Sequence, residues 1–148
     1  MSLTDQLQGD LKAAMKGRDA VRVSTLKLAL AALRNRQIEL RSPGAELNLP
    51  DSETVSVLRK EARHRQESIM AFQSGGREEL AAREAAELAV LRNYLPAELS
   101  ADQIRALVAE IVAGGISDYG AVMKAVMSRA AGQADGKLAA ELVRQKLQ

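Results

Sequence analysis

The stretch Leu95-Pro96-Ala97-Glu98-Leu99-Ser100 decides how the chain is divided. Its proline keeps the preceding residue out of helical geometry, because the proline ring clashes with that residue's backbone. Ser100 and Gln103 have the spacing of a capping box, the pair of side-chain to backbone hydrogen bonds that begins many helices. A helix therefore ends before the proline and a new helix begins after the serine. We predict two domains, residues 1–95 and residues 96–148.

Upstream of this stretch, apolar residues recur every three or four positions, which is the period of a helix with one buried face. The pattern predicts four helices, running to about residue 16, from about 20 to near 41, from 51 or 52 to the Gly75-Gly76 pair, and from 77 to 94. Residues 42–50 contain two prolines and a glycine and are predicted to be a loop. The side chains predicted to face the core are Leu3, Leu7, Leu11, Met15, Val23, Leu26, Leu30, Leu33, Leu40, Val55, Leu58, Ala62, Ile69, Phe72, Ala81, Ala85, Leu88, Leu91 and Leu95.

Downstream of the same stretch, three shorter helices are predicted. The first follows Ser100 and ends at Gly114-Gly115, the second begins at Ser117 or Asp118 and ends at Gly132, and the third is capped by Asp135. No useful length of chain alternates apolar and polar residues in the manner of a strand. The predicted fold is therefore all-α, with an N-terminal four-helix domain followed by a small C-terminal three-helix bundle.

The composition excludes several classes of site. The 148 residues include no cysteine and one histidine, so thiolate nucleophiles, disulfides, Cys-based metal sites and His-rich metal sites are all excluded. Lys and Arg number 21 against 19 Asp and Glu, a balance that does not by itself demand a nucleic-acid partner. Neither a secretory signal nor a membrane-spanning run is visible, and we expect a cytoplasmic protein with no membrane partner.

No residue is predicted to be catalytic, to bind a cofactor or to ligate a metal. His64 could serve as a general base, but its basic and acidic neighbours favour a solvated helix face. The carboxylates Glu78, Glu79, Glu84 and Glu87 could form an acid–base pair, but the first two fall in a helix's opening turn, where acids are favoured anyway. The paired glycines lack the lysine and the preceding strand of a nucleotide-binding loop.

The strongest candidate for binding lies on the predicted helix between residues 118 and 130. Its outward face is nearly bare of large side chains, with Lys124 and Arg129 projecting among small residues and Ser128 close by. Small residues let another backbone approach closely, and isolated cations suit a phosphate chain or an acidic partner. Lys137, beside the start of the last helix, would add a further cation. The alternative interpretation is a plain surface built from good helix formers.

A second basic surface is predicted on the third helix, where Arg59, Lys60 and Arg63 lie within one and a half turns. These cations could contact phosphates. The alternative is that the interleaved acids Glu61 and Glu67 make this an ordinary exposed helix face.

Several motifs in fixed order carry a family resemblance. They are Tyr94-Leu95-Pro96 followed by Leu99-Ser100, the run from Tyr119 to Met127, the run from Gly132 to Gly136 with Val143 and Leu147, and the Phe72 to Arg77 turn. In these the chain resembles the GatB/YqeY-like family over essentially its whole length, and it is similar to the free-standing YqeY-like proteins. It departs from the family pattern at Lys124, where a small glycine is frequent.

The resemblance implies an N-terminal helical domain and a C-terminal three-helix domain that also forms the tail of the B subunit of the glutamine-dependent tRNA amidotransferase. In that subunit the tail recognises tRNA. We therefore expect a non-catalytic tRNA-associated module, with Lys124, Ser128, Arg129 and Lys137 as RNA contacts, that works beside a tRNA-charging or amidotransferase complex. The carbon–nitrogen ligase label of the family, with glutamine as amido donor, would then describe the complex.

Two alternatives to this expectation stay open. One is an amidotransferase subunit with activity as part of a complex, although the chain offers no activated nucleophile for glutamine hydrolysis. The other is a protein-interaction adaptor that docks through its Ala-rich helical faces, because a face of small residues serves a protein as well as an RNA.

Overall fold

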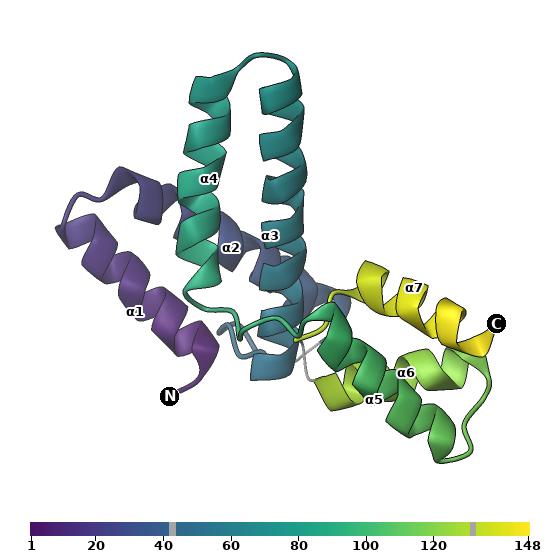
Figure 1. Cartoon of the computed structure of the whole chain (residues 1–148). Helices are drawn as coiled ribbons and strands as arrows, with labels where there is room; N and C mark the ends of the chain where they lie inside the picture. The colour runs from purple at the N-terminus through teal and green to yellow at the C-terminus, as the bar shows by residue number, and fades with distance from the viewer. Residues whose placement is uncertain (42–43, 131–132) are drawn as a thin grey trace. The chain divides into compact units, whose positions relative to one another are not determined.

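A computed structural model describes residues 1–41, 44–130 and 133–148, which contain seven helices and no strand. The helices are α1 (Leu3–Lys16), α2 (Ala20–Glu39), α3 (Asp51–Ser74), α4 (Glu78–Arg92), α5 (Ala101–Ala113), α6 (Tyr119–Ala130) and α7 (Gly136–Leu147), as Figure 1 shows. The contacts group into two compact units, Met1–Leu95 with α1 to α4 and Pro96–Gln148 with α5 to α7. The all-α prediction is confirmed. The division into two domains, residues 1–95 and residues 96–148, stays a prediction.

Side chains fix the start of the first helix from two directions. Ser2 and Asp5 form the capping box that their spacing predicts. In addition, the Asp51 carboxylate accepts a hydrogen bond from the Leu3 N–H at 2.9 Å. The prediction that Asp51 or Ser52 caps α3 was wrong. Pro50 occupies the N-cap position of α3, and no side chain caps that helix. Asp51 caps α1 instead, so it ties two helices that are distant in sequence.

The N-terminal unit has its core between α1, α2, α3, α4 and the chain that leads into α3. Gln37 clamps this incoming chain: its amide donates to the Glu46 carbonyl at 2.9 Å and accepts from the Asn48 N–H at 2.7 Å. Leu47 and Leu49, which belong to the predicted loop, are buried in the core beside these two hydrogen bonds. The largest buried side chains of this core are Leu7, Leu26, Leu30, Leu33, Leu47, Leu49, Leu58, Leu88, Val90 and Leu91.

Helices α3 and α4 run side by side as a hairpin (Figure 1). Gly76 in the turn has φ +73°, in the left-handed region that glycine adopts without strain. Across the hairpin, the Arg65 guanidinium bonds to Glu84 at 3.0 Å and also to Glu87. Arg65 and Glu87 are each only 11% exposed, so this is a buried ion cluster. No pattern in the sequence predicts that these three residues interact.

Three side chains predicted to be in the core are exposed. Met15 is 53% exposed because four-residue steps drift by about 40° each on a helix, so the stripe that begins at Leu3 has rotated away by its fourth member. Leu40 is 43% exposed because α2 ends at Glu39 and the chain turns there. Ala85 is exposed because the buried face of α4 is centred on the side that carries Glu84 and Glu87.

The C-terminal unit packs its three helices around one small core. Ser100 and Gln103 form the predicted capping box at α5, and the Asp135 side chain caps α7 by accepting from the Leu138 N–H at 3.0 Å. The Leu99 N–H donates to the Gln133 carbonyl at 2.7 Å and so closes the unit near its start. The predicted end of α6 at Gly132 lies outside the described residues. The fully or nearly buried core is Ile104, Val108, Ile111, Val122, Val126, Ala130, Ala134, Ala139, Leu142 and Val143.

Candidate nucleic-acid interface

Helix α6 presents the face of small residues that the sequence predicts. The Asp118 carboxylate accepts from the Ala121 N–H at 3.0 Å and so caps the start of the helix. Val122 and Val126 are fully buried on the inner side. Gly120, Ala121, Lys124 and Ser128 are exposed on the outer side. The outer side therefore offers a flat surface from which one long cationic side chain rises.

Lys124 and Ser128 form the pair that α6 brings together. They lie four residues apart, which places them about 40° apart around the helix and one turn apart along it. Both are exposed, and within the described part of the chain Lys124 makes no hydrogen bond or ion pair. An ammonium and a hydroxyl at this spacing can contact neighbouring phosphate oxygens of one backbone.

Arg129 does not share this face. It lies five residues after Lys124, about 140° around the helix. Its guanidinium instead pairs with Glu110 of α5 at 3.0 Å, with Arg129 48% and Glu110 66% exposed. Sequence patterns do not predict this pairing, because the two residues belong to different helices. Arg129 therefore borders the α5 side of α6, and its charge is balanced.

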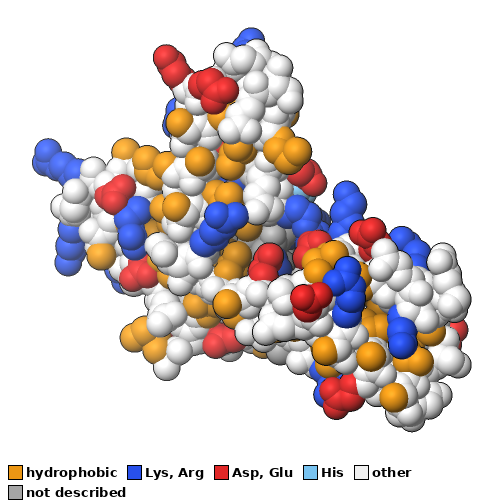
Figure 2. All heavy atoms as spheres, in the orientation of Figure 1, with side chains coloured by type: hydrophobic (Ala, Val, Ile, Leu, Met, Phe, Trp, Pro, Cys, Tyr) orange, Lys and Arg blue, Asp and Glu red, His pale blue; other side chains and the backbone are white. Residues whose placement is uncertain are grey.

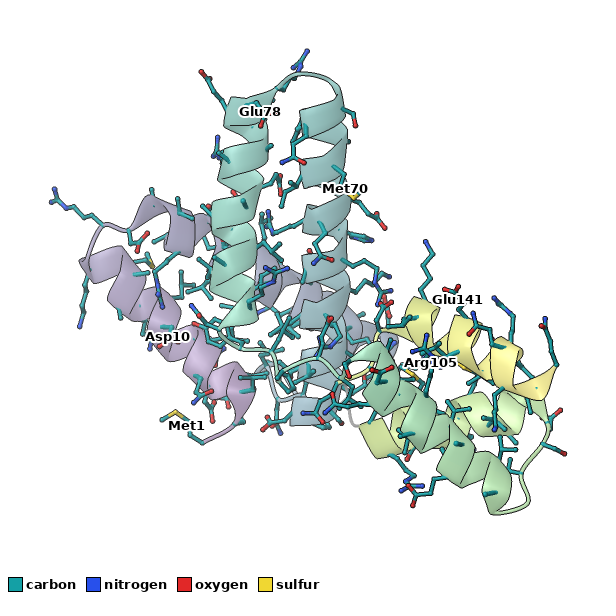
Figure 3. All side chains as sticks on the ribbon, in the orientation of Figure 1. Met1, Asp10, Met70, Glu78, Arg105 and Glu141 are labelled. Atoms are coloured by element: carbon teal, nitrogen blue, oxygen red, sulfur yellow. The ribbon has the colours of Figure 1, made fainter. Side chains whose placement is uncertain are left out.

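Lys137 lies in the first turn of α7, on that helix's exposed side. The preceding residue, Gly136, lies close to α6. A Cβ atom added to Gly136 would be in van der Waals contact with the terminal methyl carbon of Met127, at 4.0 Å. Lys137 is exposed, and so is Glu141, which follows it by one turn and is labelled in Figure 3. The start of α7 is thus beside α6, but Lys137 has an acid for a neighbour where Lys124 has small residues.

Charge in the C-terminal unit is mixed. On the face shown in Figure 2, basic, acidic and hydrophobic side chains are interspersed over this unit. Arg105 of α5 pairs with Asp102 at 2.9 Å, and the Arg144 guanidinium of α7 stacks over the Tyr119 ring at 5.7 Å. Arginines in this unit are therefore engaged within the protein, whereas Lys124 extends into solvent.

The three basic residues predicted to form a second surface on α3 do not share one exposed face. Arg59 is only 8% exposed, so it does not belong to an exposed phosphate-binding face. Lys60 and His64 are exposed, as expected for a solvated helix face, and Arg63 is half-buried. Residues 59 and 63 lie only about 40° apart around the helix, on its more buried side, whereas residue 60 lies about 100° from residue 59 on the exposed side.

The structure has a groove between α5 and α7 that the sequence analysis did not predict. Its walls come from two helices that are far apart in the chain. It has a volume of about 320 Å³ and a mainly apolar lining. It is lined by Arg105, Val108, Ala109, Leu142, Gln145 and Lys146.

The part of the chain that the structure describes contains neither a cluster of metal ligands nor a membrane-spanning helix. Across residues 1–41, 44–130 and 133–148, no three His, Cys, Asp or Glu side chains gather closely enough to hold a metal ion. In the same portions, no helix combines the length and the apolar character needed to cross a membrane.

Comparison with known proteins gives one family and one group of relatives. The family model described as YqeY-like protein matches residues 4–147. Among curated proteins, the chain is 31% identical over 108 residues to "Altered inheritance of mitochondria protein 41, mitochondrial" of Kluyveromyces lactis, covering 72% of this chain and 56% of that protein. The protein of the same name from Saccharomyces cerevisiae strain YJM789 is 28% identical over 102 residues, covering 66% of this chain and 53% of its own length. The chain thus spans about half the length of these curated relatives.

Proposed function

The chain belongs to the YqeY-like protein family, and from that premise we propose that it is a non-catalytic binding module for tRNA. The single observation that supports this function is the outer face of α6. There Lys124 stands exposed and unpaired within the described residues, with Ser128 one turn away and the small residues Gly120 and Ala121 exposed on the same side. Such a face lets a sugar-phosphate backbone approach closely and meet a cation.

Two further residues, Lys137 and Arg129, complete the proposed RNA contacts. Lys137 is exposed and reaches the same ligand from the first turn of α7, where backbone N–H groups also favour an anion. Arg129 contributes after it exchanges Glu110 for a phosphate, which is inexpensive because the pair is exposed.

The proposed partner complex is the machinery that charges tRNA or amidates it, with this chain as an accessory component. Carbon–nitrogen ligase activity with glutamine as donor would then belong to the assembled complex. The predicted location in the cytoplasm stays a prediction, and the yeast relatives are named as mitochondrial proteins.

The test measures binding of unfractionated tRNA to the full chain by fluorescence anisotropy over a range of salt concentrations. Wild type should bind saturably at low salt and more weakly as salt rises. The double variant Lys124→Glu/Lys137→Glu should bind at least about tenfold more weakly, and the slope of log K against log salt should fall by about 1.5, the share of two phosphate contacts.

The matched control is Lys12→Glu/Lys16→Glu, which makes the same change of net charge on exposed lysines of α1. It should change the salt slope little. Equal losses in both double variants would show that net charge alone drives binding and that the α6 site is wrong. Absence of wild-type binding at low salt would remove the tRNA function itself.

A further inference from the structure

Helix α2 has a second apolar side that the N-terminal unit leaves uncovered. Its inner side carries Leu26, Leu30 and Leu33, each 5% exposed or less. On the outer side Val21, Leu28 and Ile38 are 37%, 56% and 73% exposed. Isolated exposed aliphatic residues are ordinary on protein surfaces, but three on one face of a single helix are not scattered.

The spacing of this outer side is that of a helix-pairing seam. Val21, Leu28 and Asn35 are seven residues apart, and Ala31 and Ile38 follow Leu28 and Asn35 by three residues, which is the three-four spacing of a heptad repeat, with Ser24 at the equivalent place after Val21. We call Val21, Leu28, Ala31, Asn35 and Ile38 the α2 seam. Because it spans residues 21 to 38 of α2, the seam runs for about 26 Å along the helix. A partner that matches this length and spacing is another helix.

Unpaired positive charge lies along one edge of the seam. Lys27 and Arg34 are one heptad apart, exposed, and without a hydrogen bond or ion pair among residues 1–41 and the other described segments. Residues 1–41 hold eight Lys and Arg against four Asp and Glu. Each of those acids is already engaged: Asp5 and Asp19 cap helices, Asp10 accepts a hydrogen bond from Tyr94, and Glu39 pairs with Arg36.

We infer that the α2 seam docks a partner protein through an amphipathic helix with acidic residues beside its apolar stripe. Leu28 and Ile38 gain from burial against aliphatic side chains and gain nothing from phosphates, so a protein is favoured over RNA. A second copy of the chain is disfavoured in antiparallel pairing, because residues at the edge occupied by Lys27 and Arg34 would then face their own counterparts. The inference concerns α2 and is independent of the proposed tRNA site on α6.

The test uses the full chain and a designed, fluorescently labelled peptide of four heptads, with Leu at positions a and d and Glu at e and g. Repulsion between its own glutamates keeps the peptide from self-pairing. Wild type should bind it and should not bind the matched peptide with Lys at e and g. Leu28→Gln/Ile38→Gln should weaken binding at least about tenfold, since two buried aliphatic contacts are lost. Lys27→Glu/Arg34→Glu should reverse the preference toward the Lys peptide.

Controls separate the seam from general stickiness and from folding. Met70→Gln removes a side chain of similar exposure, 67%, on α3 and away from α4 (Figure 3), and should bind the Glu peptide as wild type does. Since the changed residues are all exposed, circular dichroism and thermal unfolding should be unaltered. Equal binding of both peptides, or of neither, overturns the inference. So does a dimer of wild type that Leu28→Gln/Ile38→Gln dissociates, or a loss of tRNA affinity in that variant.

Discussion

Arg65 and Arg129 each join two helices through a carboxylate 3.0 Å away, one in each unit, yet they stand in opposite surroundings. Arg65 is 11% exposed between α3 and α4, with Glu84 25% and Glu87 11% exposed. Arg129 is 48% exposed beside α5, and its partner Glu110 is 66% exposed. A charge taken out of water depends on its partner, whereas a charge left in water exchanges partners at little cost. Depth, not distance, therefore separates a structural arginine from an available one.

The largest effect should come from breaking the buried cluster. Arg65→Ala leaves Glu84 and Glu87 close together in the hairpin without the buried cation that joins them, and the free energy of unfolding should fall by about 3 kcal/mol. Urea unfolding of the full chain measures this. Arg83→Ala is the control, because Arg83 meets Glu87 only at 3.8 Å and is 72% exposed, and it should cost less than about 0.5 kcal/mol. Equal costs for the two variants would show that burial does not govern these ion pairs.

An intermediate case is the hydrogen bond between Tyr94, after α4, and Asp10 of α1, where the phenol donates to the carboxylate at 2.5 Å. Burial, and then this hydrogen bond, raise the pKa of Tyr94 from 10 to about 12. The unfolded chain therefore loses the phenol proton first, and the contribution of Tyr94 is complete below pH 10 and declines as pH rises toward 12. Tyr94→Phe should cost about 1 kcal/mol at pH 8.

The pH dependence of that cost sharpens the test. The difference in unfolding free energy between wild type and Tyr94→Phe should shrink steadily when measured at pH 9, 10 and 11. Tyr119→Phe, which changes a 39% exposed ring in the other unit, supplies the comparison for general alkaline effects. A difference that stays constant over this range would mean that Tyr94 titrates alike in the folded and unfolded chains.

Local signals in the sequence predicted most of the fold. These signals depend on residues close together in the sequence. They are the capping boxes at Ser2 and Ser100, the cap at Asp135 and the three-four period of apolar residues, and the structure has them where they were expected. The errors were of another kind. Asp51 caps a helix 48 residues away, Ala85 is exposed because α4 turns its acids inward, and the groove between α5 and α7 exists only once these helices meet.

The candidate site divides in the same way. The pattern within α6 placed Lys124 and Ser128 on one exposed face, which follows from helical period alone. It could not show that Arg129 pairs with Glu110, or that Arg59 is buried, because both depend on which neighbouring helix packs against that side. Sequence patterns thus predict the direction of a side chain around its own helix and leave its partner on the next helix undetermined.

The smallest effect should come from the exposed pair, and it links stability to the proposed function. Arg129→Ala should change the unfolding free energy by less than about 0.5 kcal/mol. Glu110→Gln leaves the arginine intact and removes its competitor, so tRNA affinity should rise about twofold to threefold at low salt, the reciprocal of a weak surface ion pair. The matched control is Asp102→Asn, which removes one negative charge from α5 and releases Arg105. It should raise tRNA affinity only through that loss of charge, and so by less than Glu110→Gln does. If both substitutions raise affinity equally, Arg129 holds no special position toward RNA, and the interface reduces to the lysines of α6 and α7.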